Sequence, residues 1–375
     1  MVAIRILLAG LLSCLLVGVV STTAARPVAA VPLEPNVALA RAIADRYIAE
    51  HDPRKLAWDW GESVLMTALT DLSQATGDAS YRDFVKRWAD FHTRLGPILD
   101  PPVYSSDSSA PAIPNIALFR DLGGARYRDV VDRTTSYLDH WAPRTADGGI
   151  SHYPIVPPTL WADSLYMFGE VMIRVGELDG DAARLQQYSD QYRIFATHLQ
   201  DPSGWFTHAY NWVLAQQDPN VFWGRGNGWV ITSATDYLRV LAARGGSDPA
   251  VTASVVGLAH AIIASQDASG LWWTVVNRPG DTYLETSATA LFATGLARAY
   301  RLGLLDDSAR PVIERAVAGL RSKIVDDAQG RPVVTSTSGP TDPGPFSAYA
   351  GVQQQGDVTY GVGAVITALI EAAGL

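Results

Sequence analysis

The chain has 375 residues, of which 48% are hydrophobic and 18% charged, and its formal net charge is −9. This composition supports a sizeable core and argues against disorder. Because phosphate binding needs clustered cations and the sequence has no basic run, nucleic acid is excluded as an expected partner. The 11 Trp and 15 Tyr are numerous for this length, and such rings build cores but also offer flat platforms for sugars.

Residues 1–30 are predicted to be a secretory signal peptide. Arg5 precedes an apolar run over 6–20 that is short for a membrane span, and small residues follow it. Cleavage is expected after Ala25 or after Ala30. The sequence therefore predicts an exported, secreted protein.

The stretch that ends at Cys14 resembles a lipoprotein box, but the apolar run continues past this residue, so lipid anchoring is the weaker alternative. Cys14 is the single cysteine, so disulfides and thiol chemistry are excluded for the mature chain. No later segment is long and apolar enough to span a membrane. Without a recognisable linker, residues 31–375 are expected to form one catalytic domain.

Apolar periodicity in this domain predicts helix after helix and almost no alternating strand pattern. Helices with one charged face, typical of an outer layer, alternate with apolar helices rich in small residues. The apolar helices, interpreted as an inner layer, are expected near 61–76, 112–123, 161–177, 226–244, 284–303 and 359–374, after a leading helix near 36–50. This gives about twelve helices in six hairpins, repeating at roughly 45 to 65 residues.

Six hairpins of this length predict an all-α fold, a closed (α/α)6 barrel. An open helical solenoid is the alternative, but solenoids usually repeat at about 34 to 47 residues without long aromatic loops. Here the turns ADGGISHY, DPSGWFTHAY, DASGLWWTVV and DAQGRPVV lead into such loops, which are expected to form one rim around a site. The stretch 336–345, rich in Pro, Gly and Ser, is interpreted as a long surface loop.

Two aspartates are candidate catalytic groups. Asp163, in LWADSLYM, lies among aromatic and apolar residues at a helix start. It is either a helix cap or a desolvated carboxyl whose raised pKa suits a general acid. Asp107, in VYSSDSSAP, precedes another inner helix and by itself is an ordinary turn or cap residue.

Two histidines occupy equivalent places in the repeats. His208, in GWFTHAY, follows one of the turns, and His152, in GGISHY, follows an earlier one. A histidine among aromatic residues is more often a packed, hydrogen-bonded side chain than a ligand contact. Both readings stay open at this point.

The segment FWGRGNGWV, residues 222–230, looks like a phosphate loop, but its glycines are spaced G-x-G-x-G and no strand is predicted before it. We interpret Arg225, between Trp223 and Trp229, as a guanidinium placed to bind a carboxylate. The alternative is a structural arginine. There is no HExxH or GxSxG motif and the histidines are scattered, so no metal site and no cofactor is predicted.

Several stretches together resemble the unsaturated glucuronyl and rhamnogalacturonyl hydrolases, glycoside hydrolase families 105 and 88. Besides the segments above, they are WDWGESVL at 58–65, GLWWTVV at 270–276, YLETSATALFA at 283–293 and YGVGAVITAL at 360–369. They follow the family's order over nearly the whole chain. The resemblance implies an (α/α)6 barrel that hydrates the C4–C5 double bond of a terminal unsaturated uronic acid, so that the ring opens and the neighbouring sugar leaves.

The same resemblance implies residue roles. The general acid/base falls on Asp163 and a second, tuning aspartate on Asp107, while His208 and Arg225 fall on substrate contacts. Aromatic positions that line the cup fall on Trp60, Trp161, Trp223 and Trp229, and His152 is a weaker match. The implied partner is an oligosaccharide with a terminal unsaturated uronic acid, from pectin, ulvan or a glycosaminoglycan; oligomeric state is not indicated.

The sequence departs from the family at three places. Ser108 follows Asp107 where relatives often have a second acid, Glu170 replaces a common proline, and Asn211 replaces an acid near the histidine. These departures bear on the exact substrate more than on the reaction. Two alternatives to this function also stay open. One is a conventional glycosidase with two carboxylates about 5 to 9.5 Å apart, and the other is a non-catalytic carbohydrate-binding protein.

Overall fold

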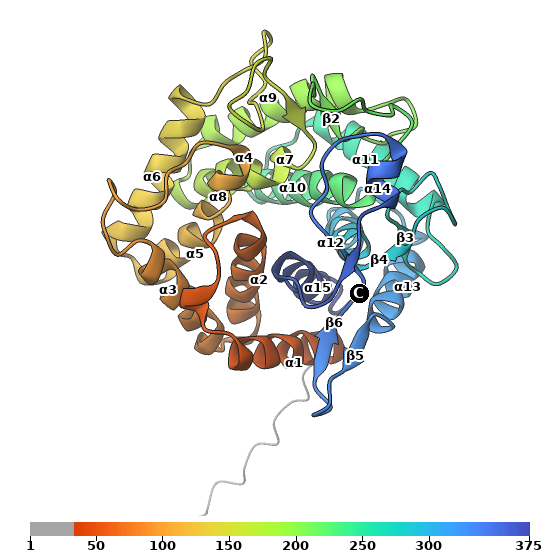
Figure 1. Cartoon of the computed structure of the whole chain (residues 1–375), viewed down its shortest axis with the longest axis horizontal. Helices are drawn as coiled ribbons and strands as arrows, with labels where there is room; N and C mark the ends of the chain where they lie inside the picture. Colours follow the sequence, from red (N-terminus) through yellow and green to blue (C-terminus); the bar gives the residue numbers. More distant parts are fainter. Residues whose placement is uncertain (1–33) are drawn as a thin grey trace, which may run out of the picture. The chain divides into compact units, whose positions relative to one another are not determined.

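The computed structural model describes residues 34–375, so the predicted signal peptide, its cleavage sites and Cys14 lie outside the described residues. Two concentric layers of helices make up this part of the chain (Figure 1). The outer helices are α1 (Pro35–Glu50), α3 (Ala79–His92), α6 (Ala125–His140), α9 (Ala182–Leu199), α11 (Pro249–Ala264) and α13 (Ala309–Arg321). The inner helices are α2 (Trp60–Thr76), α5 (Ala112–Leu122), α8 (Gly169–Asp179), α10 (Gly224–Ala243), α12 (Thr286–Arg301) and α15 (Thr359–Glu371).

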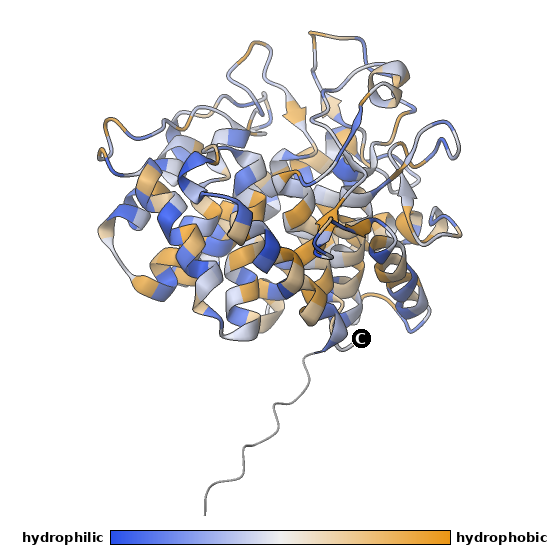
Figure 2. Ribbon diagram, turned by 60° about the horizontal axis from the view of Figure 1, so that its bottom comes forward, coloured by the Kyte–Doolittle hydropathy of each residue, from blue (hydrophilic) through white to orange (hydrophobic). Residues whose placement is uncertain are grey.

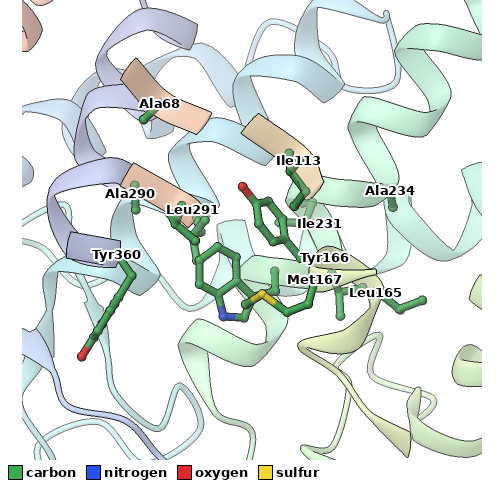
Figure 3. Packing of buried hydrophobic residues seen from close by; sticks show 14 of the residues in the cluster. Ala68, Ile113, Leu165, Tyr166, Met167, Ile231, Ala234, Ala290, Leu291 and Tyr360 are labelled. Carbon is green, nitrogen blue, oxygen red and sulfur yellow. The ribbon is translucent and has the colours of Figure 1, made fainter. Parts of the chain in front are cut away.

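The inner helices form a closed ring. Each packs against the next in chain order, and α15 packs against α2. The inner helices share one central apolar cluster, to which Ala68, Ile113, Ile231, Ala290 and Tyr360 belong, and Leu165 of the short helix α7 (Ser164–Met167) joins it (Figure 3). The predicted (α/α)6 barrel is therefore confirmed, and the open solenoid is excluded because the ends of the array meet.

The inner helices approach one another closely because glycines face their neighbours. A Cβ on Gly228 of α10 would lie 2.7 Å from the Cβ of Leu291 on α12. A Cβ on Gly363 of α15 would lie 2.8 Å from the backbone of Leu65 on α2. Real Cβ atoms do not come this near, so the small residues noted in the sequence set the radius of the ring.

Short connections join the C-terminal ends of the inner helices to the outer helices. Gly77 ends α2 in the left-handed conformation (φ 72°), and Asp78 then accepts a hydrogen bond from the backbone N–H of Ser80 to cap α3. Gly180 and Asp181 do the same between α8 and α9. This Gly-Asp pairing is the usual chemistry of a helix stop followed by a helix start.

Long loops lead instead to the N-terminal ends of the inner helices, and they gather on one side of the barrel (Figure 2). They carry η1 (Pro53–Lys55), α4 (Ser106–Ser109), α7 (Ser164–Met167) and α14 (Phe346–Ala350). They also carry four antiparallel pairs: β1 (Leu160–Trp161) with β2 (Ala209–Tyr210), β3 (Trp272–Trp273) with β4 (Leu284–Glu285), β5 (Ile324–Asp326) with β6 (Pro332–Val334), and β7 (Thr337–Ser338) with β8 (Gln354–Gln355). These strands are two or three residues long, too short to show an alternating pattern in the sequence.

The helix predicted over 161–177 is divided in the structure. The chain passes through β1, then the single turn α7, and then α8. The other predicted inner helices agree with the structure to within a few residues. The exception lies where Asp163 enters the barrel, so a loop conformation there replaces the regular helix that apolar periodicity suggested.

The repeated turns predicted from the sequence are confirmed. Each follows an outer helix and closes with a glycine of positive φ: Gly148 (94°), Gly204 (96°), Gly270 (84°) and Gly330 (73°). In each, the glycine N–H donates to the carbonyl three residues earlier. These turns start the loops of the rim. None of the helices in residues 34–375 combines the length and the apolar character that crossing a membrane requires.

A cavity opens at the C-terminal ends of the inner helices. Charged residues make up much of its lining, and none of its lining residues is aromatic. Arg174 donates to Glu170 at 3.0 Å, Arg239 donates to Asp236 at 2.7 Å, and Arg298 lies 3.9 Å from Asp236. Helix C-termini carry partial negative charge, which favours arginines at this end. This ion network lines the end of the barrel opposite the long loops.

Glu170 is the buried acid of this network that holds a proton most readily. Burial, and then the charge of Asp236, raise the pKa of Glu170 well above its usual range, and Arg174 compensates only in part. Above the ordinary pKa of a glutamate, the unfolded chain releases this proton while the folded protein still binds it. The contribution of Glu170 to the free energy of unfolding of the wild type is therefore full at low pH. It is lost as the pH rises toward the pKa of Glu170 in the folded protein.

We expect Glu170→Gln to lose this pH dependence, because an amide does not titrate. Relative to wild type, the free energy of unfolding of the variant should increase by about 1 to 3 kcal/mol between pH 5 and pH 8. Urea unfolding at both pH values measures it. Glu177→Gln replaces a half-exposed residue at the same cavity and is the control. Its free energy of unfolding relative to wild type should change by close to zero between the two pH values. Equal pH dependence of the two variants would contradict the raised pKa of Glu170.

Candidate active site

A cavity at the N-terminal ends of the inner helices collects most of the predicted site residues. Its walls include Trp60, Asp107, His152, Trp161, Asp163, Trp223 and Arg225, together with Tyr153, Met167 and residues 340–342. The space between them, including the part that is open to solvent, is about 420 Å³. Residues from six separate segments of the sequence therefore meet at this cavity.

Asp163 and His208 are brought together by a pair of short strands. β1 pairs with β2 in the register Leu160 to Tyr210 and Trp161 to Ala209, and the N–H of Ala162 donates to the carbonyl of His208 at 2.9 Å. The carboxylate of Asp163 then lies 3.4 Å from Nε2 of His208. Asp163 occupies the N-cap position of α7, as the helix-cap interpretation expected, but its side chain makes no capping hydrogen bond to this helix.

The charge state of Asp163 differs from the expectation. Burial raises the pKa of Asp163, but the neighbouring His208, 3.4 Å away, and the charge of His152 outweigh it, so the pKa lies below its usual range. The predicted rise in pKa is therefore wrong for the free protein. Aromatic walls alone would have raised it, but the sequence did not reveal that two histidines would face this carboxylate.

His208 is buried between a tyrosine and a tryptophan. Its Nδ1 lies 2.9 Å from the hydroxyl of Tyr349, and its ring packs on Trp223 with centroids 4.3 Å apart. Burial lowers the pKa of His208 below its usual range, although Asp163 acts in the opposite direction. Near neutral pH the pair therefore consists of an ionised Asp163 beside a neutral His208. Tyr349, on α14, had no local signal in the sequence.

Asp107 faces the same cavity from α4. Ser105 supplies the capping box of this short helix, so the carboxylate of Asp107 is not used as a cap. Its Oδ2 accepts a hydrogen bond from the hydroxyl of Tyr153 at 3.4 Å and lies 3.6 Å from Nε2 of His152. The ordinary turn or cap role considered for Asp107 is therefore not what the structure shows. Tyr153 was missed, although it directly follows His152 in the sequence.

His152 is held as rigidly as His208. Its Nδ1 lies 2.9 Å from the hydroxyl of Ser164, and its ring stacks on Trp161 at 4.1 Å with an interplanar angle of 5°. Trp161 in turn packs edge-on against His208. Trp161 thus lies between the two histidines, and each histidine faces one of the two aspartates.

Arg225 lies at the cavity, but its neighbours differ from those expected. Its guanidinium packs on Trp223 and Tyr360, with distances to the ring centroids of 4.8 and 5.1 Å. It donates to the carbonyl oxygens of Ser338 at 2.6 Å and Gly339 at 2.7 Å. Most of its hydrogen-bonding capacity therefore holds a loop, as the structural alternative anticipated.

The other tryptophans predicted for the cup divide into two groups. Trp60, Trp161 and Trp223 line the cavity. Trp229 does not: it is 1% exposed and packs against Tyr166 in the barrel core, with centroids 4.6 Å apart. The reason is local geometry: Trp223 precedes α10 with an extended backbone, whereas Trp229 lies within the helix and packs into the core.

The stretch 336–345 is not the surface loop that its composition suggested. Thr337, Ser338 and Gly339 are buried, and Thr341 and Asp342 line the cavity. Glu285, the N-cap of α12, accepts a hydrogen bond from the N–H of Ser338 at 2.8 Å. We call residues 337–342 the cavity loop. Glu285 and Arg225 anchor the cavity loop. This gives a structural role to the motifs FWGRGNGWV and YLETSATALFA, which contain these two residues.

The glycine-rich segment also positions His208. Asn227 accepts from the N–H of Phe206 at 2.8 Å and donates to its carbonyl at 2.9 Å. This pair of bonds fixes the chain two residues before His208. A phosphate-loop function is therefore not needed to account for FWGRGNGWV.

Several buried polar atoms at this cavity form no hydrogen bond within residues 34–375. They are Nε2 of His152, Nε1 of Trp161, Oδ2 of Asp163, Nε2 of His208, Nε1 of Trp223 and Nε of Arg225. Buried polar groups are normally paired, so their gathering marks a place that binds a polar ligand. The same described residues contain no cluster of three or more His, Cys, Asp or Glu side chains suited to a metal ion.

Comparisons with known proteins agree with this architecture. Residues 39–375 match the model of Glycosyl Hydrolase Family 88. The unsaturated rhamnogalacturonyl hydrolase YesR of Bacillus subtilis is 28% identical over 269 residues, which cover 69% of this chain and 76% of that protein. The unsaturated 3S-rhamnoglycuronyl hydrolase of an Alteromonas species is 26% identical over 216 residues, 56% of this chain and 50% of that protein.

Solved structures share the fold. A glycoside hydrolase from family 105 of C. acetobutylicum superposes with a TM-score of 0.82 at 22% identity, covering 89% of this chain and 98% of that one. An unsaturated glucuronyl hydrolase of Bacillus sp. GL1 superposes with a TM-score of 0.68 at 17% identity, covering 89% and 95%.

Arg225→Gln is expected to lower the free energy of unfolding by about 2 to 4 kcal/mol, because two charge-assisted hydrogen bonds to the cavity loop are lost. Urea unfolding measures the loss, and limited proteolysis should locate new cleavage in 337–345. Arg278→Gln removes a part-exposed arginine 3.9 Å from Asp218 and should cost less than about 1 kcal/mol. Equal losses in both variants would argue against Arg225 as the anchor.

Proposed function

Because the chain belongs to glycosyl hydrolase family 88, we propose that this glycoside hydrolase releases a terminal 4,5-unsaturated uronic acid from lyase-generated oligosaccharides. The observation that carries the proposal is the Asp163–His208 pair beside Asp107 and His152 in one aromatic cavity, where several buried polar atoms form no hydrogen bond within residues 34–375. The activities for which the relatives from Bacillus subtilis and Alteromonas are named support the same substrate class.

Asp163 is proposed as the general acid/base. The bound uronate brings a second negative charge next to Asp163 and removes water, and both effects raise the pKa of its carboxyl. The complex can then hold the proton that the free protein lacks. Asp163 delivers this proton to C4 and takes one from the water that adds at C5. The resulting hemiketal opens, and the neighbouring sugar leaves as an alcohol.

The neighbouring groups are proposed to position the substrate and Asp163. His208 lies 3.4 Å from the carboxylate and favours its ionised form. Asp107, held by Tyr153, and His152 bind ring hydroxyls on the opposite wall. Trp60, Trp161 and Trp223 supply flat faces for the sugar. Arg225 contributes positive potential toward the uronate, and Nε is its donor that remains without a partner in the described residues.

Asp163→Asn tests the mechanism, because the amide keeps the shape but cannot transfer a proton. Turnover of a lyase-generated oligosaccharide, followed by loss of the ultraviolet absorbance of its double bond, should fall by about 10² to 10⁴-fold. Asp218→Asn replaces a partly buried residue outside the cavity. The turnover of this control variant should stay within about twofold of wild type. Near-wild-type turnover by Asp163→Asn would refute the assignment.

The wild-type assay also decides between activities. Stable absorbance with lyase products of pectin, ulvan and glycosaminoglycans would contradict the substrate class. A conventional glycosidase is the second candidate, because Asp107 and Asp163 both line the cavity; hydrolysis of saturated nitrophenyl glycosides would favour it. Saccharide binding without any turnover, unchanged in Asp163→Asn, would favour the non-catalytic alternative.

Export is part of the proposal and rests on the sequence of residues 1–30 alone. A positive residue, an apolar run and small residues in this order direct secretion. N-terminal sequencing of the protein recovered outside the cell should begin at Arg26 or Val31. An uncleaved N-terminus would contradict the signal peptide, and lipid on Cys14 would support the anchored alternative.

A further inference from the structure

A groove on the loop face adjoins the catalytic cavity. It runs between residues 97–104, the second half of α6 with residues 141–143, and Pro154. We call it the rim groove. Its space of about 1270 Å³ is open to solvent, which is far more than the 420 Å³ of the catalytic cavity. It can therefore hold more than one sugar ring.

The rim groove carries an unusual concentration of exposed aromatic surface. Trp141 is 75% exposed and Tyr104 is 57% exposed, and both line the groove. Among residues 34–375 they are the only Trp, Tyr or Phe side chains that are exposed; every other one is buried or half-buried. Large exposed apolar surface of this kind marks a binding site, and flat amphipathic rings suit the C–H faces of sugars.

Polar atoms without partners accompany these rings. The hydroxyl of Tyr137, a residue that is 8% exposed, makes no hydrogen bond within the described residues, and neither does Nε of Arg133. Both residues line the rim groove. A buried hydroxyl or guanidinium N–H without a partner is costly. These atoms therefore call for a ligand with hydroxyl groups, which an apolar protein surface or a lipid chain does not supply.

The charge of the rim groove favours an uncharged ligand. Arg133 is its one cation; it lies 3.9 Å from Asp100 and also donates to the carbonyl of Pro101. Asp132 is the remaining charged residue of the lining. A sulfated or polyanionic segment would find no unpaired cation here. Neutral sugar rings fit the pattern of apolar faces and polar edges.

The rim groove and the catalytic cavity share a wall. The N–H of Tyr104 donates to the hydroxyl of Ser108 at 2.9 Å, and Ser108 follows Asp107 on α4. Pro154, which lines the groove, directly follows Tyr153, whose hydroxyl donates to Asp107 in the cavity. Tyr104 and Asp107 are three residues apart, so their Cα atoms are separated by no more than about 11 Å. The rim groove and the catalytic cavity therefore lie close together, with the start of α4 and the segment 153–154 between them.

We propose that the rim groove is a second saccharide-binding site, which holds neutral sugar rings that follow the terminal uronyl residue along the oligosaccharide. Trp141 and Tyr104 stack on the rings, and Arg133 and Tyr137 bind their hydroxyl groups. As a substrate subsite it rests on the proposed function. It makes the enzyme selective for longer chains over disaccharides.

Chain-length kinetics test the proposal. Trp141→Ala should lower kcat/KM for a lyase-generated hexasaccharide roughly 5- to 30-fold, mainly through KM, because one stacking face is lost. The unsaturated disaccharide of the same polymer does not reach the groove, so its kcat/KM should stay within about twofold. Trp141→Phe keeps a stacking face and should recover most of the loss. Leu214→Ala, which shortens a side chain that is 72% exposed outside the groove, is the matched control. Equal effects on both chain lengths, or none on either, would overturn the proposal.

A binding measurement separates this proposal from the proposed function. Saturated oligosaccharides lack the double bond and cannot be hydrated, but they should shield the exposed Trp141 from quenching of its fluorescence by iodide. Trp141→Phe removes the fluorescent side chain, so the shielding should disappear in this variant. If this was observed while wild type turned over no lyase product, the groove proposal would be supported and the proposed activity would be refuted. Absence of shielding of Trp141 would contradict the proposal that the rim groove binds saccharides. So would a dimer, detected by sedimentation, that dissociates in Trp141→Ala, because a second copy would then be the occupant.

Discussion

The closure of the inner helical ring is the constraint on which the rest of the structure depends. α15 can pack against α2 only if every inner helix keeps a close distance to both neighbours, and glycines at the contacts provide that distance. Closure places the N-terminal ends of all inner helices around one axis. The long loops that precede these helices must therefore converge, and side chains from distant parts of the sequence become neighbours.

The loops are fixed to this ring by buried polar side chains rather than by regular structure. Arg225 binds two carbonyls of the cavity loop, Glu285 binds one of its N–H groups, and Asn227 holds the chain before His208. Each of these bonds is shielded from water, so each contributes more than an exposed one would. A binding site made of short loops thereby gains the rigidity of the helices beneath it.

The electrostatics of the cavity follow from the same convergence. Two carboxylates, Asp107 and Asp163, each face a histidine, and Trp161 lies between the histidines. Arg225, the nearby guanidinium, is largely engaged by the backbone. The free site therefore favours an ionised Asp163, and a bound anion would shift that balance toward the protonated form. At the opposite end, arginines surround an ionised Asp236 and a Glu170 that readily holds a proton, and no aromatic residue lines the cavity there.

The sequence by itself determined the helical periodicity, the six hairpins, the recurring glycine turns and the motifs that supply Asp107, Asp163, His152 and His208. These features are local, since each depends on residues within a few turns of one another. Only the tertiary structure decided how they combine. It paired β1 with β2 and buried much of the stretch 336–345, which its composition had assigned to the surface. It also placed the cavity loop against Arg225 and Trp229 in the core. It also lowered the pKa of Asp163, because that value depends on the charges within a few ångströms, and the sequence does not specify these until the ring has closed.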